Sequence, residues 1–173
     1  MSAEIDEPVE ITDYNPHYEG RFRAERDRLR IGLATATLKF EHIGSTAVPG
    51  LAGRPVVDLM LGAPPAAWAA LEELRGRIVA LGYEDLGEAG VPGRISFRRR
   101  TKLRAFNLAL VEEGGAHWRE NVALRDYLRA NPEAAAKYAE AKRAAVAGGA
   151  RMLVAYSEAK ERAMVVFLGK ARL

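Results

Sequence analysis

The feature that most constrains the fold is a near-continuous apolar run over residues 55–61, which reads Pro-Val-Val-Asp-Leu-Met-Leu and holds a single acid, Asp58. A run of this length between turn residues is typical of a strand buried on both faces. A charge inside such a strand needs a partner or a function, because burying an uncompensated charge is costly. The run therefore predicts a sheet covered on both faces, and it marks Asp58 as a candidate functional residue.

The remaining hydrophobic patterns predict a mixed α/β (α+β) chain that forms one domain over residues 1–173. Strands are expected over residues 9–11, 37–43, 83–86, 94–100 and 103–111, the last two as a hairpin around residues 101–102. A helix is expected after the turn at residues 13–16, with Phe22, Leu29 and Leu33 as its apolar stripe. Further helices are expected over residues 66–81, 118–129, 132–146 and 154–168, so that the C-terminal third is helical.

The composition excludes several classes of protein and site. The chain has no cysteine, which excludes disulfides and thiolate-bound zinc. The acidic N-terminus does not resemble a signal peptide, and no apolar run is long enough to span a bilayer, so a cytoplasmic location is expected. A net charge of +3 and a pI near 9.3 favour small anionic ligands over nucleic acid.

A Gly-Ser turn follows the strand predicted over residues 37–43. Gly44 lets backbone amides approach an anion closely, and Ser45 and Thr46 add hydroxyl groups. Asp58 lies on the next predicted strand, so a phosphate at the turn and a metal ion at Asp58 would meet in one place. A purely structural turn is an equally good interpretation of Gly-Ser alone.

The turn belongs to a longer block, Glu41-His42-Ile43-Gly44-Ser45-Thr46-Ala47-Val48-Pro49-Gly50-Leu51-Ala52-Gly53-Arg54-Pro55-Val56-Val57-Asp58-Leu59. This block resembles the signature of the GrpB family, a group assigned to the nucleotidyltransferase superfamily. Other segments resemble the family too: Tyr14-Asn15-Pro16, residues 124–129, Asn131-Pro132 and Lys137-Tyr138. The resemblance implies a nucleotidyltransferase-like mixed sheet in which the Gly-Ser turn holds a nucleoside triphosphate, such as ATP, and strand carboxylates bind Mg²⁺.

The sequence departs from the pattern that this resemblance implies. A second acid is expected two positions after Asp58, where Met60 stands, and a thioether is a poor ligand for a hard cation. Histidines are expected on the later strand at Phe106 and Ala109, which leaves Asn107 as the polar candidate. A standard two-metal centre therefore cannot be assembled around Asp58.

Three alternatives follow. Glu41 completes a metal site with Asp58 and the phosphate oxygens of the substrate; or the protein binds a nucleotide without cleaving it; or Glu41 or His42 serves as general base toward another anionic substrate. A packed, structural role for His42 is an equal alternative. The candidates are thus Asp58, Glu41 and His42 for catalysis, with Asp58 and Glu41 for metal.

Arginines supply the remaining candidates for phosphate binding. Arg54 lies in the block, and Arg98 and Arg100 should point to the same side of their strand while Arg99 points away. Charge that protects an edge strand is the alternative interpretation. Expected partners are a nucleotide and a small-molecule acceptor, and the C-terminal helices are suited either to a homodimer interface or to a cover over the site.

Overall fold

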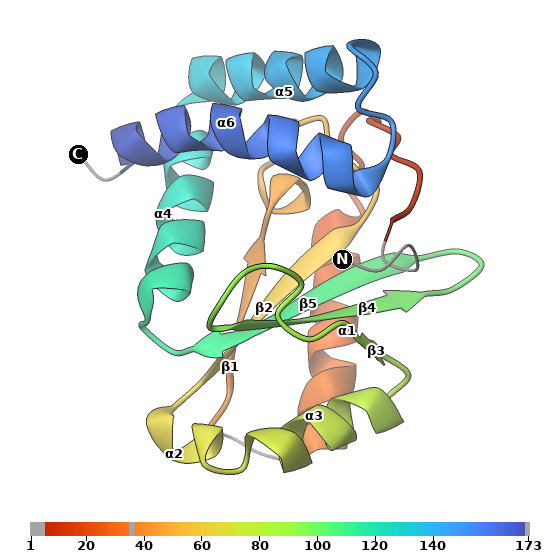
Figure 1. Cartoon of the computed structure of the whole chain (residues 1–173), viewed down its shortest axis with the longest axis vertical. Helices are drawn as coiled ribbons and strands as arrows, with labels where there is room; N and C mark the ends of the chain where they lie inside the picture. Colours follow the sequence, from red (N-terminus) through yellow and green to blue (C-terminus); the bar gives the residue numbers. More distant parts are fainter. Residues whose placement is uncertain (1–5, 35–36, 172–173) are drawn as a thin grey trace.

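The computed structural model describes residues 6–34 and 37–171, so residues 1–5 of the acidic N-terminus lie outside the described residues. Its centre is a five-stranded sheet with the order β1-β2-β5-β4-β3 (Figure 1). The strands are β1 (Lys39–Ile43), β2 (Val57–Ala63), β3 (Glu84–Asp85), β4 (Arg94–Arg100) and β5 (Ala105–Glu112). The buried run that contains Asp58 is therefore a strand, as predicted, and it lies inside the sheet rather than at its edge.

The sheet is mixed because one pair of neighbours is parallel. β2 runs parallel to β5, and the pairs β1–β2, β4–β5 and β3–β4 are antiparallel. The register places Asp58 between Ile43 of β1 and Asn107 of β5. The predicted hairpin of β4 and β5 is confirmed, with its turn at residues 101–104.

The main core lies on one face of the sheet, under α1 (Tyr18–Leu33) and α3 (Leu71–Ala80). The predicted stripe of α1 is confirmed, because Phe22, Leu29 and Leu33 are all buried there. Alternate residues of the strands, such as Leu59 and Leu108, point from the sheet toward these helices and pack against them. Burial of this apolar surface is the main favourable contribution to the stability of the sheet.

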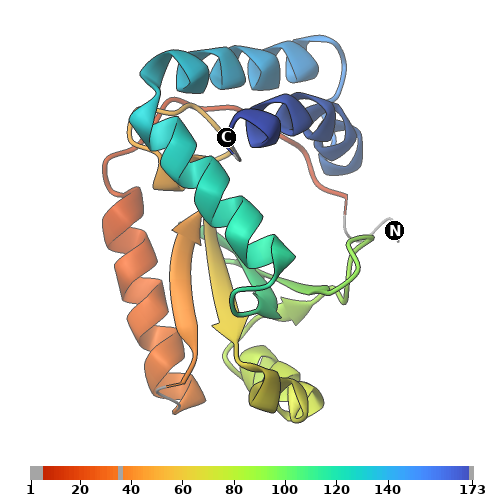
Figure 2. The same cartoon turned by 90° about the vertical axis from the view of Figure 1, so that its left-hand side faces the viewer.

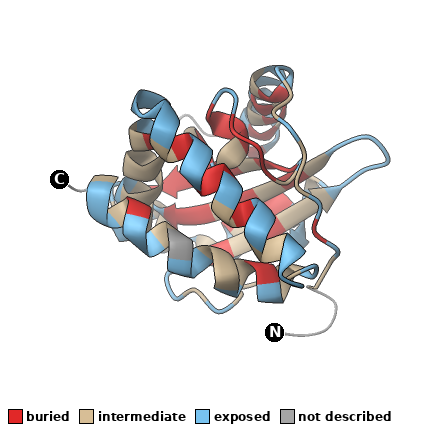
Figure 3. Ribbon diagram, turned by 90° about the horizontal axis from the view of Figure 1, so that it is seen from above, coloured by how far each residue is buried: buried red, intermediate tan, exposed pale blue. Residues whose placement is uncertain are grey.

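The other face of the sheet lies toward the C-terminal helices, as Figures 1 and 2 show. These helices are α4 (Ala116–Ala130), α5 (Pro132–Ala147) and α6 (Leu153–Ala171). This face carries Asp58, because the neighbours Val57 and Leu59 point into the main core. On this face Trp118 of α4 packs against a small cluster of Ile43, Met60 and Val111. Viewed from above, the buried residues are concentrated in the strands, and the outer sides of the helices are exposed (Figure 3). No helix within residues 6–34 and 37–171 has both the length and the apolar character needed to cross a membrane.

Two predicted elements differ in the structure. The strand predicted over residues 9–11 is wrong, since this segment makes only isolated bridges at Pro8 and Thr12. Pro8 lacks the N–H that a continuous ladder would need. The helix predicted over residues 66–81 is divided into α2 (Pro65–Trp68) and α3, and nothing in the intervening alanines explains the break. α3 ends before Gly82, as predicted, and the φ of +88° at Gly82 suits glycine.

Trp118 packs directly on Gly62 of β2, which gives a test of this packing. A Cβ at Gly62 would lie 2.5 Å from the Trp118 ring, so Gly62→Ala should force the ring to move. We expect a loss of about 1–3 kcal/mol in the free energy of unfolding, together with a change in tryptophan fluorescence. Gly20→Ala is the control: Gly20 lies within α1 with open space around it, and alanine there should stabilise the protein by about 0.5–1 kcal/mol. Equal stabilities of the two variants would contradict this packing.

Candidate functional site at the Gly-Ser turn

Asp58 faces the Gly-Ser turn at the start of β2. One of its carboxylate oxygens, Oδ1, accepts a hydrogen bond from Nδ2 of Asn107 at 2.8 Å. The other, Oδ2, lies so close to Gly44 that a Cβ there would be 2.5 Å away. Gly44 has φ +71° and ψ −168°, a combination that is essentially restricted to glycine. The glycine therefore permits both the sharp turn and the close approach of the carboxylate.

Ser45 meets a lysine that comes from the helical layer. Lys142 of α5 donates hydrogen bonds to Ser45 Oγ at 2.5 Å and to the backbone carbonyl of Ala52. Gly53 makes room for this contact, because a Cβ there would lie 2.5 Å from Cβ of Ser45 and 3.2 Å from Nζ of Lys142. The turn, the loop that follows it and α5 are thus joined around one amine.

Lys142 is almost completely buried, with 1% of its surface exposed. Burial is the main cause that lowers the pKa of its amine to about 7; the positive charges of Lys160 and Arg143 contribute to the lowering, and Asp58 opposes it. The amine also lies 4.7 Å from the centre of the Tyr138 ring. Lys142 therefore changes its charge near neutral pH, and a neighbouring anion would favour its protonated form.

Thr46 and His42 belong to the opposite side of the turn. The His42 ring contacts the Thr46 hydroxyl at 2.9 Å and the Glu19 carboxylate at 3.2 Å, and it stacks on Phe22. Burial lowers the pKa of His42, although Glu19 partly offsets this effect, so the ring is neutral near pH 7. The structure places both side chains in the packing between β1 and α1. His42 does not share the face of the sheet that carries Asp58, and as a general base it would need to move.

Glu41 lies on the same face as Asp58 but opposite Met60 rather than Asp58. Its carboxylate accepts a hydrogen bond from Arg125 of α4 at 2.5 Å. Arg125 also donates to the backbone carbonyl of His42, so this ion pair fastens α4 to β1. The structure does not bring Glu41 into one ligand set with Asp58, because that would require breaking the pair with Arg125.

The three candidate arginines all contact acids. Arg98 and Arg100 leave the sheet on the same side, as predicted, whereas Arg99 turns to Glu25 on the other face. Arg98 pairs with Glu84 of β3 at 2.6 Å. Arg54 and Arg100 both bind Glu7 of the N-terminal segment. These ion pairs direct the three guanidinium groups to acids rather than to the Gly-Ser turn.

The donor set fits one Mg²⁺ that arrives with a phosphate ligand, and it does not fit two metal ions. Met60 and Ala109 face each other two residues beyond Asp58 and Asn107, where further ligands would be needed. Asn107 turns its amide nitrogen toward Asp58, since its oxygen accepts a hydrogen bond from Arg100 at 3.1 Å. No cluster of three or more His, Cys, Asp or Glu side chains suited to a metal occurs in the described part of the chain. Oδ2 of Asp58 is directed at the turn, and one such oxygen is enough for a cation that keeps waters and phosphate oxygens.

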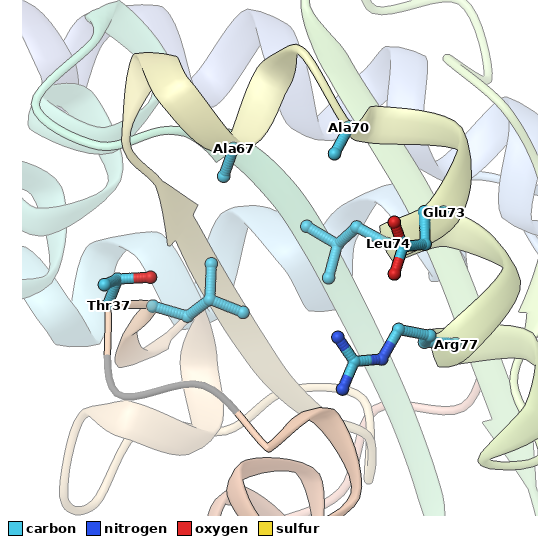
Figure 4. Close-up of a pocket in the computed structure, with 7 residues that line it drawn as sticks. Thr37, Ala67, Ala70, Glu73, Leu74 and Arg77 are labelled. Atoms are coloured by element: carbon cyan, nitrogen blue, oxygen red, sulfur yellow. The ribbon is translucent and has the colours of Figure 1, made fainter.

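A separate pocket of about 130 Å³ lies at the other end of β1 and β2 (Figure 4). Its lining comes from α2, the break after it, α3 and the segment before β1: Thr37, Leu38, Ala67, Ala70, Glu73, Leu74 and Arg77. The guanidinium of Arg77 binds the backbone carbonyl of Leu33 there. This pocket shares no residue with the Asp58 site.

Comparison with known sequences identifies the family. Residues 8–169 match the family described as GrpB protein. The chain belongs to the GrpB family. Its curated relatives include the UPF0157 protein YqkA of Bacillus subtilis, 31% identical over 78% of this chain, and a UPF0157 protein of Streptomyces coelicolor, 31% identical over 94%. This GrpB chain spans 39% of the length of YqkA and 84% of that of the Streptomyces protein.

Solved structures agree on the fold. The GrpB protein of Enterococcus faecalis superposes with a TM-score of 0.77 at 25% identity, covering 95% of this chain and all of that one. The Cid1 poly(U) polymerase with bound Mg and 3′-dATP has a TM-score of 0.52 at 14% identity, over 75% of this chain and 41% of Cid1. Terminal uridylyl transferase 4 of Trypanosoma brucei with bound UTP gives 0.52 at 15% identity, over 81% of this chain and 44% of that protein. This GrpB chain therefore has the nucleotidyltransferase fold.

Lys142 is the site residue that the sequence did not single out. It stands in a polar and alanine-rich stretch of α5 and looks like one of many surface lysines. Its spacing from Tyr138 is a usable signal, because residues four apart share a helix face. Tyr138 is buried, so a lysine on the same face should be buried as well.

The lowered pKa of Lys142 predicts how the free energy of unfolding depends on pH. Its pKa is about 7 in the folded protein and near the ordinary 10.5 when unfolded, so the unfolded chain binds more protons between these values. The free energy of unfolding should therefore rise with pH over this range, by up to about 5 kcal/mol, and Lys142 should add no pH dependence well below pH 7, where it is protonated in both states.

Lys142→Met should remove this rise, as measured by urea unfolding at several pH values. Lys137→Met is the matched control, since Lys137 lies on the exposed side of the same helix. If the variants at 142 and 137 show the same pH dependence, the amine is not held in the neutral form.

Proposed function

We propose that this GrpB protein binds a Mg²⁺-bound nucleoside triphosphate at the Gly-Ser turn and transfers its nucleotidyl group to a small-molecule acceptor. The observation that supports this most strongly is the convergence of Asp58, Ser45 and Lys142. A carboxylate oxygen of Asp58 from the sheet lies beside Gly44, and the Ser45 hydroxyl, next in sequence, binds the buried amine of Lys142 from the helical layer beside Gly53. This combination suits a polyanion with an associated cation.

Each group has a distinct part in this proposal. Gly44 admits a phosphate close to the backbone, and Ser45 and Lys142 donate hydrogen bonds to its oxygens. Asp58 holds the cation, which neutralises charge on the phosphates when bound. Asn107 orients the Asp58 carboxylate through its amide. In the transfer, an acceptor oxygen forms a bond to the α-phosphorus, the bond to the bridging oxygen breaks, and pyrophosphate leaves.

The fold relationship supports the proposal without naming a substrate. Cid1 and the Trypanosoma transferase share the fold at 14% and 15% identity, and their structures hold nucleotides. The chain covers less than half of either protein, and the poly(U) and uridylyl activities in their names are not carried over.

A second candidate function is nucleotide binding without transfer. Met60 and Ala109 favour it, because they place apolar side chains where a second metal ion would need oxygen ligands. The two candidates make the same prediction for binding and different predictions for turnover.

Calorimetric titration of ATP, GTP, CTP and UTP, each with and without Mg²⁺, tests the shared prediction. We expect at least one nucleotide to bind in a Mg²⁺-dependent way, and Asp58→Asn to weaken that binding by about tenfold or more. Asp27→Asn is the control, since Asp27 is a solvent-exposed acid on α1. Binding that is indifferent to both Mg²⁺ and Asp58 would rule out the proposed site. Pyrophosphate release from the nucleotide that binds would favour transfer over binding alone.

The lowered pKa of Lys142 predicts that protons are taken up when a nucleotide binds. Its pKa near 7 should rise when phosphates approach, so the complex should take up as much as about one proton per nucleotide at pH 7.5. Titrations in two buffers with different ionisation enthalpies measure this uptake, and affinity should fall as the pH rises above 7. Lys142→Met should lose the effect and Lys137→Met should keep it. The same uptake in both variants would remove Lys142 from the phosphate site.

A further inference from the structure

Glu7 occupies a cradle made by two arginines. Its carboxylate accepts hydrogen bonds from Arg100 at 2.7 and 3.2 Å and forms an ion pair with Arg54. Burial alone would raise the pKa of Glu7, but Arg100 and Arg54 more than offset this and lower it. Two guanidinium groups from separate elements thus converge on one planar anion, which is the geometry that arginine provides for carboxylates.

The cradle is connected to Asp58 by hydrogen bonds. Arg100 donates to Oδ1 of Asn107 at 3.1 Å, and Nδ2 of the same amide donates to Asp58 at 2.8 Å. Arg54 follows Gly53, the glycine that packs against Ser45. The pKa of Tyr156 on α6, raised to about 12 mainly by burial, is influenced by both Arg54 and Asp58. An anion in the cradle would therefore lie beside the proposed nucleotide site, outside the Gly-Ser turn.

The segment that carries Glu7 is attached in a way that permits replacement. Residues 6–12 form no continuous strand, and their backbone is held by isolated bridges from Pro8 to Met152 and from Thr12 to Gly53. Figure 1 shows the segment running beside the connection between α5 and α6. Attachments of this kind open with less free energy than a continuous ladder, so a ligand could displace Glu7 without disturbing the sheet.

We propose that Arg54 and Arg100 form the binding site for a carboxylate of the acceptor, and that Glu7 fills this site as an internal substitute until the acceptor displaces it. The assignment to an acceptor rests on the proposed function, and the anion site itself does not. A carboxylate is favoured over a phosphate because the occupant is itself a carboxylate: Arg100 donates to both of its oxygens, and Arg54 donates to Oε1. The N-terminal segment then regulates access, since it competes with the acceptor for the same two side chains.

Glu7→Gln tests the site directly, because it keeps the shape of the side chain and removes its charge. The probes are acetate for a carboxylate and inorganic phosphate for a phosphate, each titrated in the absence of nucleotide while NMR follows the side-chain Nε–H signals of Arg54 and Arg100. We expect Glu7→Gln to bind acetate at least about tenfold more tightly than the unmodified protein, because it removes the effective concentration of a tethered competitor.

Glu10→Gln is the matched control, since Glu10 carries the same charge on the same segment and is exposed. It should leave acetate affinity unchanged, and Arg100→Gln added to Glu7→Gln should abolish the gain. Equal acetate affinities for the Glu7→Gln and Glu10→Gln variants would overturn the proposal. A gain for phosphate alone would overturn the assignment to a carboxylate.

A second measurement leaves Glu7 in place. Concentrated acetate should accelerate amide hydrogen exchange at Val9 and Leu153, whose N–H groups donate to Arg151 and Glu7 carbonyls, relative to chloride at equal ionic strength. Unchanged exchange would contradict displacement of the segment. Neither experiment contains nucleotide, so failure of nucleotide binding and failure of the anion site are observed separately.

Discussion

The parallel pairing of β2 with β5 is the constraint on which the rest of the structure depends. Its register puts Asp58 beside Asn107 and, in consequence, Met60 beside Ala109. A shift by one residue would turn Asp58 into the main core under α1 and α3, because alternate residues face opposite sides of a sheet. The buried leucines of β2 and β5 on that face therefore fix the position of the acid on the other.

Much of the fold is readable from the sequence because its signals are local. The apolar run around Asp58, the stripe of α1 and the turn between β4 and β5 each fit within a short window, and each is confirmed. The pairing of β2 with β5 has no such signal, since it joins Val57 to Phe106, far along the chain. The false strand over residues 9–11 shows the same limit: its residue types suit a strand, but the segment meets only single residues of its neighbours.

The candidate site was only partly predictable for the same reason. Gly44, Ser45 and Asp58 are close in sequence and come together as expected. Lys142, by contrast, reaches Ser45 from a helix distant in the chain, and only tertiary packing distinguishes it from the exposed Lys137. Glu41 and His42 flank the turn in sequence, yet their ion pair and ring contacts direct them to α4 and α1. Proximity along the chain was enough to predict the candidate site residues. Which of them lie together at the turn depends on the partners of their side chains.

Several charges on the face of Asp58 form ion pairs between elements. Glu41 with Arg125 joins the sheet to α4, and Glu7 with Arg54 and Arg100 joins the N-terminal segment to the loop and β4. A ligand that uses one of these arginines must replace an existing acid, so its net affinity reflects an exchange of partners.

The Gly-Ser turn is held from two sides, by the bond between His42 and Thr46 on one and by the bond between Lys142 and Ser45 on the other. Its residues are therefore ordered before any ligand binds. The loss of their conformational entropy occurs on folding, so it does not reduce the binding affinity. A phosphate that takes over the hydrogen bond from Lys142 to Ser45 would also remove one contact between α5 and the Gly-Ser turn. Binding of a phosphate at the turn would in this way be linked to the position of α5, whose Lys142 it would release from Ser45.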